Sequence, residues 1–193
     1  MTLLQALEAT KEGALTPLFP VLLLGVIGAS PAWTGAVNSA FALTAVAAAP
    51  LLPMIIARGG YRAPIALGVS ICGLLLLGLV LYPSAWTAFA VFLLSGFPFT
   101  VSWVAANTLL LLSTDEARRA TVVGSVGSVY AATSLLSAVV PSVSAELVGV
   151  LPVLVVAAAI QIAAGPAFLL VSRPDHDQRR PARPEGASVL PER

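Results

Sequence analysis

Four side chains inside the long apolar runs of this chain are suited to contact a small molecule. Asn107 and Thr100 offer amide and hydroxyl hydrogen bonds, and Trp103, which recurs with them at helical spacing, offers a ring and an N–H donor. Asn38 lies in an earlier run. A polar side chain in lipid needs a partner, which either a binding cavity or a neighbouring helix can supply. We expect these residues to contact a bound molecule; the alternative is that Asn107 and Asn38 bond neighbouring helices and that Trp103 only packs.

Residue types that could carry catalysis or hold a metal are scarce. The single cysteine, Cys72, lies mid-run among apolar residues, and the single histidine, His176, lies in a polar stretch near the C-terminus. An intramembrane serine protease would need a histidine inside the membrane. We therefore expect no enzyme, no cofactor and no metal site. The apolar runs also lack charged residues, which usually mark ion pathways.

The composition predicts an all-α integral membrane protein. Of 193 residues, 58% are hydrophobic and 10% are charged, which is more apolar surface than a soluble core of this size could bury. Six apolar runs are expected to be transmembrane helices, and they cover residues 14–29, 33–57, 63–82, 85–112, 120–143 and 149–171. The predicted domains are a cytoplasmic lead-in (1–13), a six-helix bundle (14–171) and a disordered cytoplasmic tail (172–193).

Basic residues fall only on alternate loops. All ten lie before the first run, between the second and third, between the fourth and fifth, or after the sixth. They are Lys11, Arg58, Arg62, Arg118, Arg119, Arg173, Arg179, Arg180, Arg183 and Arg193. Lysine and arginine favour cytoplasmic loops. The pattern predicts a multi-pass protein of the plasma (inner) membrane with both termini in the cytoplasm.

The runs differ in the faces that they present. The second and fifth carry stripes of small residues, which allow another helix to approach closely: Asn38, Ala42, Ala45 and Ala49, and Gly127, Ala131, Ser134 and Ala138. Pro50 and Pro53 are expected to bend or end the second helix, and Ser30-Pro31 to close the first. The third run is apolar all round and is expected to face lipid over much of its surface, and Gln161 in the sixth is expected to be structural.

The loop at residues 53–62 resembles the signature loop of the major facilitator superfamily. That signature reads Gly, three residues, Asp-Arg, one residue, Gly, one residue, and Arg or Lys. Arg58, Gly60 and Arg62 match it, whereas Pro53 replaces the first Gly and Ala57 replaces the Asp. The six-run spacing, the Gly-Phe-Pro of the fourth run and the turn at residues 115–121 extend the resemblance over about residues 14–171. A degenerate loop followed by a polar tail is more typical of the second half, helices seven to twelve.

The resemblance implies half of a secondary active transporter, a permease or efflux protein that moves a small molecule by alternating access. One half supplies half of a cavity, so the implied partners are the bilayer and a second six-helix half or a second copy. The family's first and fourth helices line the cavity, and its second and fifth form the contact between halves. The implied cytoplasmic gate consists of Arg58, Gly60, Arg62, Asp115, Arg118 and Arg119, although the acidic and basic residues at 115–119 could instead only cap a helix.

Two other functions remain open at this point. The chain could be a self-contained six-helix channel or permease that works as an oligomer, or a non-transporting truncated fragment. No channel selectivity motif is present in the sequence, and no nucleic-acid partner is expected. The sequence specifies neither the substrate nor the direction of transport.

Overall fold

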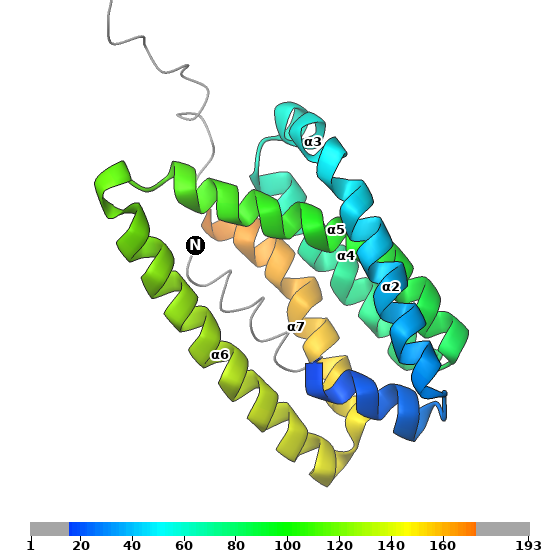
Figure 1. Cartoon of the computed structure of the whole chain (residues 1–193). Coiled ribbons are helices and arrows are strands. Elements are labelled where there is room, and N and C mark those ends of the chain that lie inside the picture. Colours follow the sequence, from blue (N-terminus) through cyan, green and yellow to red (C-terminus); the bar gives the residue numbers. More distant parts are fainter. Residues whose placement is uncertain (1–15, 173–193) are drawn as a thin grey trace, which may run out of the picture.

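The computed structural model describes residues 16–172 and folds them as a bundle of helices without strands in this range (Figure 1). A short helix, Thr16–Val26, ends in a π-helical segment, η1 (Val21–Val26). It is followed by α2 (Pro31–Ala48), the 3-10 turn η2 (Ala49–Leu51), α3 (Leu52–Gly59), α4 (Arg62–Leu81), α5 (Ala85–Leu112), the 3-10 turn η3 (Glu116–Arg118), α6 (Arg119–Val148) and α7 (Val150–Val171). The predicted lead-in and all of the predicted tail except Ser172 lie outside the described residues.

Five stretches are long and apolar enough to cross a membrane, where the sequence predicts six. They are Pro31–Gly59, α4, α5, Glu116–Val148 and α7. The sixth, Thr16–Val26, is shorter and would span about 16 Å at 1.5 Å per residue. The chain is therefore an all-α integral membrane protein whose described part comprises five spans and one short apolar helix.

Two predicted helix ends differ from the structure. The first helix ends before Gly28, where the chain turns with φ 70°, and Pro31 opens α2 after the extended Ser30. The prediction that Ser30-Pro31 closes the first run was therefore wrong, because a proline fits the first turn of a helix best. The fifth helix runs on through Pro141 and ends at Val148, beyond the predicted residue 143. The exposed carboxylate of Glu146 thus belongs to its last turn.

The surroundings of α4 differ from those predicted for the third run. α5 packs against α2 on one side and α4 on the other, and α4 packs against both α5 and α7. In the most apolar stretch of α4, 56% of the residues are buried, more than in any other span. The prediction that this helix faces lipid over much of its surface was wrong. A helix that is apolar all round is compatible with lipid and with a protein interior, and here neighbouring helices cover it.

Glycines mark the places where the packed helices approach most closely. A Cβ added at Gly73 of α4 would lie 2.8 Å from the amide nitrogen of Ile162 and 2.9 Å from Cβ of Gln161, both on α7. Gly165 of α7 lies against Ala66 and Ser70 of α4 in the same interface. Gly96 of α5 lies against backbone atoms of α2, and Gly68 of α4 lies against α5. Small residues at these crossings allow the close contact that joins helices in lipid.

The charged turns lie at one end of the bundle, at the top of Figure 1. This end, which we call the arginine end, holds the turn between α3 and α4 and the turn between α5 and α6, with Arg58, Arg62, Arg118 and Arg119. Near the arginine end, the second span changes from α-helix to the 3-10 turn η2, which contains Pro50 and separates α2 from α3. This confirms the predicted break in the second span. The break arises because Pro50 has no N–H and cannot continue the hydrogen bonding of α2.

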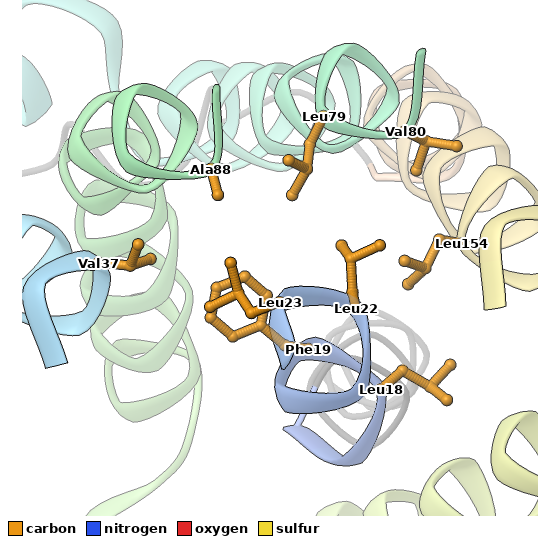
Figure 2. Close-up of a cluster of buried hydrophobic side chains, with 9 residues drawn as sticks. All are labelled: Leu18, Phe19, Leu22, Leu23, Val37, Leu79, Val80, Ala88 and Leu154. Carbon is orange, nitrogen blue, oxygen red and sulfur yellow. The ribbon is translucent and has the colours of Figure 1, made fainter. Parts of the chain in front are cut away.

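The opposite end of the bundle is closed by the first helix. Leu22 and Leu23, both with 0% exposure, point from this helix toward Leu79 of α4, Ala88 of α5 and neighbouring side chains (Figure 2). Val37 of α2 and Leu154 of α7 complete the cluster. These residues come from the ends of four helices, so burying them fixes the first helix across the opposite end.

The second and fifth spans are the least buried. Only 11% of the residues in the most apolar stretch of each are buried, and α6 contacts the rest of the bundle mainly through α7. Figure 1 shows α6 standing apart from α2 and α4, on the far side of α7. Val37, Ala40 and Ala48 of α2 are buried, whereas Asn38, Ala42 and Ala49 of its small-residue stripe are exposed. The stripe therefore lies mostly outside this chain's own core.

Candidate functional site

A cavity of about 530 Å³ lies among the first helix, α2, α4, α5 and α7. It is lined by Thr16, Phe19, Pro20, Thr34, Asn38, Phe41, Cys72, Leu76, Val91, Phe92, Ser95, Phe99 and Gln161. Its volume falls in the range of about 300–1,000 Å³ that is typical of small-molecule sites. Phe19 belongs both to this lining and to the core cluster at the opposite end, so the first helix forms one wall of the cavity.

The polar groups of the lining are all uncharged. Gln161 of α7 is 5% exposed. The hydroxyl of Thr34 is buried and has no hydrogen-bond partner within residues 16–172. The amide nitrogen of Asn38 donates to the backbone oxygen of Thr34 at 2.9 Å, one turn earlier in α2. The arrangement offers amides and hydroxyls to a bound molecule but no counter-charge to an ion.

Aromatic rings continue from the cavity toward α6. Phe41 lies 6.2 Å from Phe92 and 5.4 Å from Phe99 between ring centroids, and all three line the cavity. Phe99 stacks on Trp103 at 6.3 Å, and Trp103 meets Tyr130 of α6 edge-on at 5.6 Å. Such ring pairs prefer stacked or edge-to-face geometry. The row joins the cavity to the part of α5 that faces α6.

The four predicted contact residues separate into two groups. Asn38 lines the cavity, whereas Thr100, Trp103 and Asn107 are not among its lining residues and lie half-buried further along α5. The amide nitrogen of Asn107 donates to the backbone oxygen of Trp103 at 2.8 Å. Trp103 is the link between the groups, because it stacks on the cavity residue Phe99.

Sequence reasoning missed Gln161 and Thr34. Gln161 was expected to be structural, yet it faces the cavity from α7. A glutamine inside a span was itself the signal, because a buried amide needs hydrogen bonds. Thr34 gave no comparable signal, since a threonine hydroxyl in a helix can usually bond to a carbonyl of the preceding turn.

At the arginine end, Arg62 holds the last turn of α7. Its Nε donates to the Ser172 hydroxyl at 2.8 Å, and its Nη2 donates to the backbone oxygens of Leu169, at 2.9 Å, and of Ser172. The carbonyls at a helix C-terminus lack partners within the helix and carry partial negative charge. Arg62 therefore joins the start of α4 to the end of α7.

The other predicted gate residues of this turn are placed differently. Gly60 adopts φ 64° and its N–H donates to the Ile56 oxygen at 2.8 Å, which ends α3 in a conformation that favours glycine. Arg58 is exposed at one end of an apolar groove of about 810 Å³ between α3, α4 and α5. Thus Arg62 and Gly60 shape the backbone, whereas Arg58 is presented at the surface.

The predicted gate residues between α5 and α6 lie in an exposed turn at the same end. The backbone oxygen of Asp115 accepts from the Arg118 amide at 2.9 Å, at the start of η3. Nε of Arg119 donates to the backbone oxygen of Thr114 at 3.4 Å. These contacts are local to the turn. Within residues 16–172, no cluster of histidine, cysteine, aspartate and glutamate could hold a metal ion.

Replacing Arg62 with alanine is expected to lower the free energy of unfolding by about 1–2 kcal/mol, because three hydrogen bonds from a partly exposed charge are lost. The stability of Arg62→Lys should lie between that of the unaltered chain and that of Arg62→Ala. An ammonium keeps the charge at the helix end but lacks the planar guanidinium that bonds two acceptors at once. Thermal unfolding in detergent measures both variants. Arg58→Ala is the matched control, and an equal loss in it would contradict this role for Arg62.

Comparison with curated proteins and with solved structures finds no match. Comparison with protein families finds a match to the model of the Major Facilitator Superfamily over residues 1–192, nearly the whole chain. This agrees with the all-helical structure and its apolar spans. The chain belongs to the Major Facilitator Superfamily and is a multi-pass membrane transporter.

Proposed function

We propose that the chain is one half of a secondary active transporter, similar to helices seven to twelve of the family, that moves a small molecule across the plasma membrane by alternating access. The observation that carries the proposal is the low burial of the second and fifth spans, 11% in each. Both carry small-residue stripes, and a Cβ added at Gly124 or Gly127 of α6 would meet nothing within 4 Å. Glycine weakens a helix by about 1 kcal/mol relative to alanine. Close packing of another helix against these glycines would offset that cost.

The second half would complete a substrate path along α5. The proposed substrate contacts are Asn38, Thr100, Trp103 and Asn107. Trp103 meets Tyr130 of α6, so this part of α5 lies between the cavity and one of the two least buried spans. A partner docked on α2 and α6 would enclose it, as transporters of this type hold substrate between two repeats.

The arginine end is proposed to face the cytoplasm, with both termini on that side. All four arginines of the described residues lie there, as the positive-inside rule favours. Arg58, Gly60, Arg62, Asp115, Arg118 and Arg119 are the proposed cytoplasmic gate. Within it, Arg62 would transmit motion of the turn between α3 and α4 to the end of α7, through the bonds described above.

Co-expression tests the need for a partner. Cells that express the chain alone, a candidate second six-helix half alone, or both are compared for susceptibility to a panel of toxic compounds. We expect altered susceptibility only where two halves assemble, either the pair or two copies of this chain. Altered susceptibility in cells where the chain is shown to be monomeric would contradict the proposal.

A further inference from the structure

We propose that the cavity within this chain binds an uncharged aromatic molecule whose polar group hydrogen-bonds to the side-chain amide of Gln161. The site lies inside one half, between α7 and the helices opposite it, and is distinct from the stretch of α5 that contains Thr100, Trp103 and Asn107. The inference rests on the proposed function only in making the bound molecule a transported one. Binding itself requires nothing outside this chain.

Gln161 carries the inference. As a residue it is 5% exposed, it lines the cavity, and no hydrogen bond joins its side chain to another described residue. Its Cβ is held against α4, where Gly73 leaves room for it and an added Cβ would come within 2.9 Å. An amide that faces a cavity offers two donors and two acceptor sites to a molecule bound there. A ligand in the cavity would supply the missing partner.

Thr34 supplies a second and independent observation on the opposite wall. Its hydroxyl is buried and without a partner, although a threonine in a helix usually bonds to a carbonyl of the preceding turn. Asn38, one turn later, donates to the backbone oxygen of Thr34 through one amide hydrogen, which leaves its carbonyl oxygen and second hydrogen. Unused hydrogen-bonding groups therefore face the cavity from α2 as well as from α7.

The lining selects against charge. None of its residues is ionisable except Cys72, and four are phenylalanines: Phe19, Phe41, Phe92 and Phe99. A charged ligand would lose its hydration without gaining a counter-charge, which is strongly unfavourable in an apolar site. Aromatic rings, in contrast, stack well on phenylalanine. The chemistry of the wall fits an aromatic amide, ketone or alcohol rather than a carboxylate or an amine cation.

Cys72 allows the cavity to be probed in the unaltered chain. It is the single cysteine of the sequence and lines the cavity at 7% exposure, with its sulfur 3.8 Å from the backbone oxygen of Ser95. The full chain in lipid nanodiscs is treated with N-ethylmaleimide, and intact mass gives the rate of modification. The probes are 2-naphthamide and 2-naphthoate, which share a ring system and differ in charge.

We expect 2-naphthamide to slow modification of Cys72 by about fivefold or more and 2-naphthoate by less than about twofold at the same concentration, since only the amide can enter without a counter-charge. In Gln161→Leu and Thr34→Val, which keep the side-chain size, protection by 2-naphthamide should fall at least about threefold, because a buried hydrogen bond is lost. Ser128→Ala, which removes an exposed hydroxyl of α6 that bonds within its own helix, should keep full protection. Either variant alone suffices if the other fails to fold.

Equal protection by the two probes, no protection by either, or undiminished protection in the folded variants would overturn the site. These outcomes are separate from those of the co-expression test. A chain that assembles with a second half but is not protected by 2-naphthamide refutes only the cavity, and a protected chain that never assembles refutes only the half-transporter.

Discussion

Replacing Gly96 with alanine is expected to lower the free energy of unfolding by about 1–3 kcal/mol, the usual effect of forcing an extra methyl group into a packed interior. A Cβ at this position would overlap the Phe41 oxygen and the Thr44 hydroxyl, and would lie 3.1 Å from the Ala45 amide nitrogen. Two of these three atoms belong to the backbone of α2, so no side-chain rotation relieves the overlap. α2 must move away from α5. Thermal or denaturant unfolding in detergent measures the change.

Gly78→Ala is the matched control for this prediction. Gly78 lies in α4, and an added Cβ there would meet nothing within 4 Å. The control should be neutral or more stable by up to about 1 kcal/mol, because alanine favours a helix. Opposite signs for the two glycines would support the close crossing of α2 and α5. A neutral Gly96→Ala would refute it.

Replacing Gly127 with leucine is expected to weaken assembly with a second half or a second copy by at least about tenfold, which corresponds to about 1.4 kcal/mol. Gly127 is exposed on the small-residue stripe of α6 and has open space around it within this chain. A leucine would keep two helices apart where close approach is the main source of attraction in lipid. The fraction of assembled protein in nanodiscs, measured as the protein is diluted with lipid, reports the effect.

The same substitution at Gly78 separates assembly from insertion and folding. Both glycines are helical and have open space around them, but Gly78 lies on α4, outside the two small-residue stripes. Gly78→Leu should leave the assembled fraction unchanged, and both variants should unfold at nearly the native temperature. If the two substitutions reduce assembly equally, the stripe on α6 is not the contact surface.

Helix boundaries were predictable from sequence where a capping residue marks them. The predicted fourth span and α5 share the bounds Ala85–Leu112. Ser84 precedes the helix, and its hydroxyl oxygen accepts from the Thr87 amide at 3.1 Å, as a residue at this position commonly does. The interruption at Pro50 was also predictable, because a proline disrupts helical hydrogen bonding wherever it occurs in a helix interior.

Which face of a helix is covered was less predictable. The third span is apolar on every side, so hydropathy could not tell that α4 lies between α5 and α7. The glycines at residues 73 and 165 decide this contact, yet Gly78 in the same helix faces open space. Only the packed structure distinguishes them. The exposed stripe on α2, in contrast, was visible in the sequence, since Asn38, Ala42 and Ala49 are all small or polar.

The candidate site shows the same division. Asn38 was chosen because it is polar within a span, and it lines the cavity. Gln161 satisfies the same criterion but was expected to be structural. Its role depends on Gly73, which allows α7 to approach α4 and brings the amide to the cavity. That dependence joins residues 88 positions apart, and no local pattern records it.

The claim that this chain is half of a transporter is tested most directly by the composition of the transporting unit. The chain is purified from cells in which it alters compound susceptibility, and native mass spectrometry of the detergent complex counts its subunits. We predict two six-helix bodies in each complex, either this chain with a second half or two copies of it. A transporting preparation that contains only single copies of this chain would contradict the account.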